Sequence, residues 1–289
     1  MLLFDFGEML SIARIGNKNQ LELHSNLVDY SPDLFEKTEK IETVLNYLYH
    51  EDSDKEKLQH EAVYISLSAG CGLQYKTFGV AQDAFMVNGS RTTKAEQQDA
   101  IVEVCKNNLS MEYTPSVINV YVTDTEYILS VGYIPTEYLH NLQSAFSNMG
   151  VSVFDIKPFG SLLYQAVNKE SLGGQCIVDA GNELILINSL GLIGWSKPDD
   201  FVVADNELAN NYLMAQSEAL YRIENTDTSL IGIKDIRPYL NADYDGEINS
   251  CVVAALALMK QQKAELKGGL SDVANKIRLF FDKRRSQEN

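Results

Sequence analysis

The residues of this sequence best suited to chemistry are acidic side chains beside two short turns that contain glycine. They fall into two groups with the same order: Asp5, Gly7 and Glu8 first, then Asp179, Gly181 and Glu183. Two carboxylates held close together can transfer protons or bind a divalent cation, so Glu8 and Glu183 are one candidate pair. No histidine or nucleophile accompanies either group. We therefore consider a structural role for both turns first.

Each group lies between two short apolar stretches, as in a β-hairpin with a tight turn. The first hairpin is predicted over Phe4–Ile12 and the second over Val178–Leu186. Asp and Gly are common in every tight turn, so one such hairpin indicates little. Because the same hairpin occurs twice, we predict a duplicated domain whose halves face each other. The alternative is that these are plain turn residues of a scaffold without chemistry.

Composition is that of an ordinary soluble protein. Its 289 residues are 45% hydrophobic, which allows a sizeable core and two domains. The formal net charge of −16 argues against a nucleic-acid partner, which would need a basic surface. Residues 260–289 differ, because they hold eight Lys or Arg against four Asp or Glu. Such a basic tail indicates an anionic surface, an acidic partner or simply a solvated terminal helix.

Cysteine and histidine usage does not support a metal site. The cysteines are widely spaced, without a C-x-x-C pair or a preceding signal peptide, which is typical of reduced cytosolic thiols: Cys71, Cys105, Cys176 and Cys251. The histidines show no ligand spacing. The longest apolar run, Cys251–Met259, is far shorter than the roughly twenty residues that a bilayer requires. We predict neither a metal site nor a membrane span.

Hydrophobic periodicity predicts the elements of the first half of the chain. The first are three antiparallel strands within 2–29, a helix over 34–50 and a parallel strand over 62–67. An inserted module over 78–135 follows, with a helix from Thr92 and strands over 117–122 and 127–133. The last are a helix from Thr136 to Gly150, a strand over 151–156 and a helix over 160–167. Thr136 is predicted to cap its helix and Gly150 to end it.

Ser171–Gly174 is the best boundary signal in the sequence. We therefore predict domain 1 over 1–170, domain 2 over 174–259 and a basic tail helix over 260–289. The predicted elements of domain 2 are strands over 176–179, 183–188 and 192–195, a helix over 207–222, a strand over 229–233 and an apolar helix over 248–259.

The order of these segments resembles the PilM-like actin-fold proteins of type IV pilus assembly, including MshI-type proteins of MSHA pili and GspL-type cytoplasmic relatives of type II secretion. The resemblance covers nearly the whole chain and is most specific from Tyr133 to Phe159. It implies an α/β, actin-like (ribonuclease H-like) fold of duplicated domains. It also implies an inserted PilM-type subdomain 1C over 78–135 and a reduced subdomain 2B over 201–245.

The two hairpins resemble the two phosphate loops of that family. In active actin-like ATPases, amide and hydroxyl groups of these loops hold phosphates, while two Asp residues hold Mg²⁺ and order the attacking water. By resemblance, a vestigial nucleotide cleft would consist of Asp5, Gly7, Asp179 and Gly181.

Departures from the family pattern indicate that this chemistry has been lost. The family usually has small hydroxyl residues and a Lys after the first turn, whereas here Glu8 follows it and no Lys occurs before Lys18. Asn182 and Glu183 follow the second turn. A like-charge contact near 4 Å costs on the order of 4 kcal/mol, and two would offset a micromolar affinity of about 8 kcal/mol. We expect no enzymatic activity and no cofactor, with ATP and Mg²⁺ bound weakly or not at all.

The resemblance also implies a partner. In the family, a groove between the inserted module and the first domain receives an N-terminal peptide of the membrane protein PilN. Tyr113, Tyr121 and Tyr127 are candidates for such a groove, or plain core or surface aromatics. The Lys283–Arg285 cluster suits an amphipathic helix on an anionic membrane or the cytoplasmic flank of a span.

These observations predict a non-catalytic cytoplasmic scaffold at the inner membrane face of a bacterium. It would serve a type IV pilus, MSHA-type included, or a type II secretion platform. Its expected partners are a PilN-like bitopic protein and the pilus assembly ATPase, with peripheral membrane contact through the tail and no nucleic acid. The alternatives are a nucleotide-binding actin-like ATPase or sugar-kinase-like enzyme, and a filament-forming protein.

Overall fold

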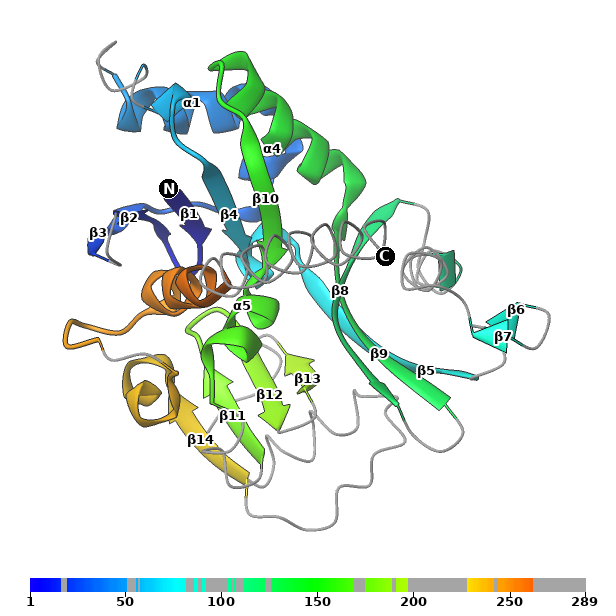
Figure 1. Cartoon of the computed structure of the whole chain (residues 1–289). Helices are drawn as coiled ribbons and strands as arrows, with labels where there is room; N and C mark the ends of the chain where they lie inside the picture. The colour runs from blue at the N-terminus through cyan, green and yellow to red at the C-terminus, as the bar shows by residue number, and fades with distance from the viewer. Residues whose placement is uncertain are drawn as a thin grey trace, which may run out of the picture.

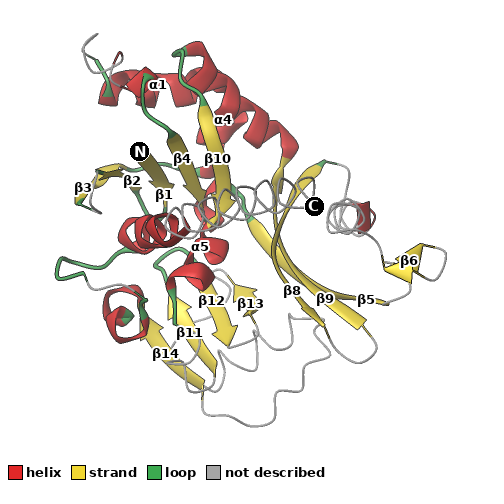
Figure 2. Cartoon of the chain, in the orientation of Figure 1, coloured by secondary structure: helices red, strands yellow, loops and turns green. Residues whose placement is uncertain are grey.

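The protein has a mixed α/β fold with several separate sheets (Figures 1 and 2). The computed structural model describes residues 1–16, 20–50, 56, 58–81, 86–87, 90–91, 103–104, 107, 112–122, 126–168, 175–188, 191–196, 228–241 and 244–261. Several predictions lie outside these residues: most of the helix from Thr92, the boundary at Ser171–Gly174, the helix over 207–222 and the basic tail beyond residue 261.

The first half of the chain builds a five-stranded sheet around β1 (Leu2–Phe6). The other strands are β2 (Leu10–Ile15), β3 (Leu21–Val28), β4 (Val63–Leu67) and β10 (Val153–Pro158). The order is β10-β4-β1-β2-β3, with β1 antiparallel to β2 and parallel to β4, and with β4 parallel to β10. The predicted meander and the predicted parallel position of the fourth strand are confirmed.

Two helices, α1 (Thr38–Leu48) and α4 (Thr136–Asn148), pack against each other on one side of this sheet (Figure 1). Phe4 of β1 meets Phe146 of α4 edge to face, with ring centroids 5.0 Å apart. The prediction of a single helix over 34–50 is wrong in part. Residues Pro32–Glu36 form a separate 3-10 helix, because Lys37 has an extended backbone that interrupts the helical run.

The region predicted to be an inserted module contains a three-stranded antiparallel sheet with the order β5-β9-β8. Its strands are β5 (Gln74–Ala81), β8 (Tyr113–Val122) and β9 (Glu126–Pro135), so the module begins before the predicted residue 78. The short strands β6 (Met86–Val87) and β7 (Ser90–Arg91) pair with each other beside it.

The helix α4 follows β9 directly, and the prediction that Thr136 caps it is wrong. Pro135 occupies the N-cap position and Thr136 is the first helical residue, because the strand leads straight into the helix. The Thr136 amide donates to the carbonyl oxygen of Glu112 over 2.8 Å. Gly150 has a φ of 75° just after the helix, as predicted for its C-terminal end.

The second half builds a four-stranded sheet with the order β13-β12-β11-β14. Its strands are β11 (Gln175–Asp179), β12 (Leu184–Asn188), β13 (Gly191–Ser196) and β14 (Thr228–Gly232). β11 is antiparallel to β12 and parallel to β14, as β1 is to β2 and β4. Both predicted hairpins are confirmed, and they occupy equivalent positions in their sheets.

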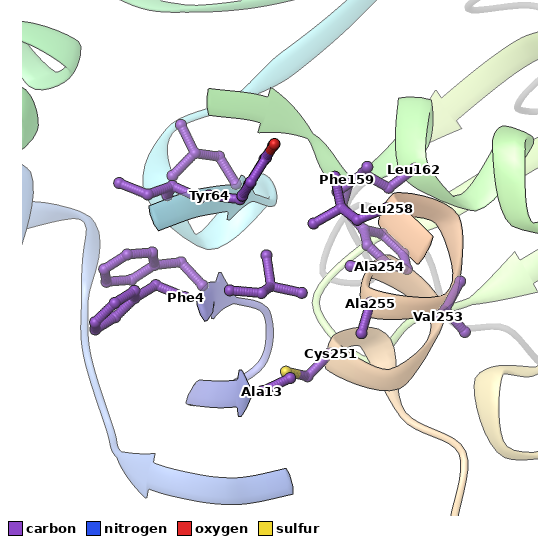
Figure 3. Close-up of a cluster of buried hydrophobic side chains, with 14 of the residues drawn as sticks. Phe4, Ala13, Tyr64, Phe159, Leu162, Cys251, Val253, Ala254, Ala255 and Leu258 are labelled. Carbon is purple, nitrogen blue, oxygen red and sulfur yellow. The ribbon is translucent and has the colours of Figure 1, made fainter. Parts of the chain in front are cut away.

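Between the two sheets lie α5 (Phe159–Ala166) and a helix over residues 250–261 (Figure 1). The latter begins at Ser250 rather than at the predicted residue 248, because Asn249 caps it: the Asn249 side-chain oxygen accepts from the Val252 amide over 3.0 Å. Residues Cys251–Met259 are all buried, and Figure 3 shows several of them in one cluster with Ala13, Phe159 and Leu162. Among the described residues, no helix is long and apolar enough to cross a membrane.

Candidate functional site

The turns of the two hairpins touch each other, and we call this contact region the hairpin junction. The Asn182 side-chain amide donates to the carbonyl oxygen of Gly7 over 2.8 Å and to the hydroxyl of Ser68 over 2.7 Å. Ser68 follows β4, the strand that runs parallel to β1. The second half of the chain is therefore bonded directly to the first at the ends of its central strands.

Asp5, a predicted site residue, is fully buried at this junction. The Ser250 hydroxyl donates to its Oδ2 over 2.6 Å, and burial raises the Asp5 pKa to about 6. Gly7 has no free space above it, because a Cβ there would lie 2.4 Å from the Ser250 Oγ. The first turn thus faces a protein side chain.

Tyr30 and Ser68 fix the backbone of the first turn. The Tyr30 hydroxyl lies 2.7 Å from the carbonyl oxygen of Phe6 and 2.5 Å from that of Gly7, and the Ser68 hydroxyl donates to the Phe6 oxygen over 2.5 Å. Sequence reasoning missed Tyr30, Ser68 and Ser250. For Ser68 a signal existed, because polar residues just after neighbouring parallel strands meet at one sheet edge.

Glu183 is also fully buried, and it bonds to both halves of the chain. Its Oε2 accepts from the Ala69 amide over 3.1 Å and from the Trp195 indole over 3.2 Å. Burial raises its pKa to about 8, with a smaller contribution from the charge of Asp5. Burial thus favours the uncharged form of the Glu183 carboxyl, and the expected repulsion of phosphate by Glu8 and Glu183 stays a prediction.

The candidate carboxylate pair differs from the one considered from the sequence. Asp5, not Glu8, is the acid whose charge acts on Glu183. Glu8 is exposed and lies over the second turn, where a Cβ on Gly181 would be 2.8 Å from the Glu8 Oε2. Of the pair considered from the sequence, Glu8 and Glu183, only Glu8 faces solvent.

Asp179 and Gly181 are used within their own turn. The Gly181 amide donates to the Asp179 Oδ1 over 2.9 Å, and Gly181 has a φ of 89°, which favours glycine. The structure thus brings Asp5, Gly7 and Gly181 to the junction, while the Asp179 carboxylate stabilises the turn. Asn182 and Ser250 each bond to the first turn or to the strand before it, Asn182 at the Gly7 carbonyl oxygen and Ser250 at the Asp5 carboxylate.

Several junction oxygens have no hydrogen-bond partner in the described part of the chain: Asp5 Oδ1, Ser66 Oγ, Asn182 Oδ1 and Glu183 Oε1. A buried polar atom without a partner costs about 1–3 kcal/mol. The junction therefore buries more polar oxygens than its hydrogen bonds satisfy. The described residues hold no group of three or more His, Cys, Asp or Glu side chains placed to bind a metal.

A second candidate site is a groove of about 290 Å³ between the inserted module and the first sheet, which we call the β8–β10 groove. All of β10 lines it, together with residues 114–116 of β8 and parts of β9 and α4. β10 is the last strand of the five-stranded sheet and β8 the last strand of the module sheet. The groove therefore lies between two strand edges that carry no further strand among the described residues.

The groove is lined by both apolar and polar side chains, and it contains one ion pair. Phe154 of β10 is 68% exposed and its ring lies 5.1 Å from that of Tyr64. The Lys157 ammonium lies 3.4 Å from the Asp155 carboxylate. Of the tyrosines considered from the sequence, Tyr113 packs on Tyr133 and is not among the lining residues, while the side chains of Tyr121 and Tyr127 lie outside the described part.

No protein-family model and no curated protein matches this chain. Among solved structures, it is similar to the cytoplasmic domain of EpsL, an inner-membrane component of the type II secretion system of Vibrio cholerae, with 10% identity, a TM-score of 0.48 and coverage of 91% of this chain and 94% of that one. It is also similar to a PilM–PilN type IV pilus biogenesis complex, with 13% identity, a TM-score of 0.49 and coverage of 90% and 98%. These proteins come from the two groups that the sequence resembles.

Proposed function

We propose that this chain is a non-catalytic, actin-like scaffold of a type IV pilus or type II secretion platform, which binds an extended segment of a PilN-like bitopic protein in the β8–β10 groove. The observation that carries the proposal is the groove between β8 and β10, two sheet edges with which no further strand pairs among the described residues. The proposed location is the cytoplasmic face of the inner membrane of a bacterium.

The actin-like fold is supported by the strand order of both sheets. Each half of the chain has a central strand that is antiparallel to its hairpin partner and parallel to the strand on its other side. This is the ribonuclease H-like arrangement, and its repetition supports a gene duplication. In this proposal the β5-β9-β8 sheet is subdomain 1C, inserted between β4 and β10, and the domain borders are those predicted, apart from the earlier start of the module at Gln74.

An extended peptide fits this groove by strand addition. Strand edges carry N–H and C=O groups that bind the backbone of an added strand, while the pockets beneath select every second side chain. Phe154 offers an exposed aromatic ring to an apolar side chain of the peptide, and the Asp155–Lys157 pair gives the groove its polar contacts. The expected ligand is a short, extended, mostly apolar segment.

The junction supports a scaffold rather than an enzyme. Ser250 binds the carboxylate that would order Mg²⁺ in an active relative, and Asn182 bridges the two turns. We propose that nucleotide binding has been lost because these side chains fill the space, not because of charge repulsion. The competing proposal, a nucleotide-binding ATPase, is favoured by one observation: the buried Glu183 Oε1 has no hydrogen-bond partner among the described residues.

Fluorescence anisotropy with a labelled peptide tests the partner proposal. The probe is the cytoplasmic N-terminal segment of a small bitopic protein encoded beside this gene. We expect Phe154→Ala to weaken binding at least tenfold, and Tyr47→Ala to leave it unchanged. Tyr47 is a matched control, because it is 73% exposed and lies on α1.

The peptide backbone provides a second arm of this test. Methylation of alternate peptide amides should abolish binding in one register and spare it in the other, because strand addition uses every second N–H. Two results would contradict the groove as the binding site. One is an equal loss of affinity for Phe154→Ala and Tyr47→Ala, and the other is binding that methylation does not change in either register.

A further inference from the structure

The helix over residues 250–261 connects the hairpin junction with the β8–β10 groove. At its first residue, the Ser250 hydroxyl donates to Asp5 over 2.6 Å. At its last described residue, the Gln261 side-chain oxygen accepts from the Lys157 ammonium over 2.6 Å. Lys157 lines the groove. Residues 250–261 span roughly 18 Å at about 1.5 Å per residue, so both regions are bonded to the same stretch of helix.

The body of this helix is held tightly on all sides. Residues Cys251–Met259 are buried, and they belong to the same cluster as Ala13 of β2 and Phe159 of α5 (Figure 3). A helix that is apolar all round and packed at interior density moves as a unit. A displacement at one end is therefore carried to the other end.

The sheet beneath the helix links the same two ends. Asp5, Ser66 and Lys157 are register partners across β1, β4 and β10, so their side chains lie on one face in a row. Ser250 bonds to one end of this row and Gln261 to the other. The Lys260 ammonium adds a bond of 3.0 Å to the carbonyl oxygen of Gln165 in α5.

We propose that the helix over 250–261 couples the hairpin junction to the β8–β10 groove, so that a segment bound in the groove tightens the junction and a loosened junction weakens binding in the groove. This proposal rests on the proposed function only in naming the groove as the place where a partner binds. The coupling itself is a property of the chain without any ligand.

Amide hydrogen exchange of the full chain tests the coupling without a peptide. We expect Ser250→Ala to raise exchange of the β10 amides that pair with β4 at least threefold. Gln261→Ala should raise exchange at residues 5–8 and 182–184, because coupling is reciprocal. Thr43→Ala, which removes a hydroxyl bond of 2.8 Å to Glu39 on α1, should change neither region.

The double variant identifies the route. If the helix carries the coupling, Ser250→Ala and Gln261→Ala together raise β10 exchange no more than the larger single effect. Additive effects would mean that the sheet, and not the helix, carries the coupling. Exchange that rises only beside each substituted residue would overturn the coupling itself. A peptide that fails to bind the unmodified chain would overturn the proposed function while leaving the exchange result to decide the coupling.

Discussion

The side-chain amide of Asn182 donates a hydrogen bond to the carbonyl oxygen of Gly7 over 2.8 Å, which joins the turn of the second hairpin to the turn of the first. The same amide reaches the Ser68 hydroxyl over 2.7 Å. One short amide side chain thus bonds the second half of the chain to two residues of the first half.

Asn182→Ala should therefore destabilise the chain by about 2 kcal/mol, because it removes two partly buried hydrogen bonds that join the two turns. Urea unfolding followed by circular dichroism measures this. Asn148→Ala is the matched control, since Asn148 makes an exposed bond to Glu42 on the outer helices. We expect the control to change stability by less than about 0.5 kcal/mol. Equal effects would show that the Asn182 bridge contributes nothing special.

Gly7→Ala should cost about 1–3 kcal/mol of stability, because the new Cβ would lie 2.4 Å from the Ser250 Oγ. Ser250→Ala removes that oxygen, so the double variant should lose less stability than the sum of the two single variants. A double-mutant cycle from denaturant midpoints gives the interaction energy. Strict additivity would mean that Ser250 does not close the space above the first turn.

Glu183 should make stability depend on pH in one direction. Burial raises its pKa from the ordinary 4.5 to about 8, so between these values the folded chain keeps a proton that the unfolded chain has released. The free energy of unfolding contributed by this group must then fall as pH rises from about 4.5 to about 8. Asp5 acts in the same direction over a lower range, because its pKa is raised from 3.8 to about 6.

Glu183→Gln isolates the first contribution, since glutamine resembles the uncharged acid in shape. The stability of the unmodified chain relative to Glu183→Gln should decrease by a few kcal/mol, as an order of magnitude, between pH 5 and pH 8. Guanidinium unfolding at each pH measures the difference. Parallel profiles for the two proteins would mean that Glu183 is not protonated in the folded chain.

The fluorescence of Trp195 reports the protonation state of Glu183. It is the only tryptophan of the chain, and its indole N–H donates to the Glu183 carboxyl over 3.2 Å. Its emission should change with a midpoint near pH 8, where the burial-raised Glu183 pKa lies. The transition should vanish in Glu183→Gln. A transition that persists in this variant would assign the midpoint to another group.

The sequence was sufficient to predict the hairpins and most strands, because their information is local. An apolar alternation that ends in Asp-x-Gly indicates a hairpin wherever it occurs. The helix 34–50 was predicted too long, since nothing in the hydrophobic pattern marks the extended backbone at Lys37. Thr136 was a reasonable cap by residue type, but the position before the helix belongs to Pro135.

The composition of the junction could not be predicted, because it depends on contacts between residues far apart in the chain. Ser250 binds Asp5 across almost the whole sequence, and no local pattern links them. Glu183 follows a turn, where a carboxylate is usually exposed, and only the tertiary structure buries it against Ala69 and Trp195. The groove could be expected only through the family resemblance.

The β8–β10 groove, and not the hairpin junction, is the proposed binding site of this chain. Isothermal titration of one preparation with the partner peptide, and separately with ATP and Mg²⁺, tests it most directly. We predict saturable binding of the peptide that is lost in Phe154→Ala, and no saturable heat with ATP up to millimolar concentrations. Micromolar binding of ATP that is abolished in Asp179→Ala, together with no binding of the peptide, would contradict the account.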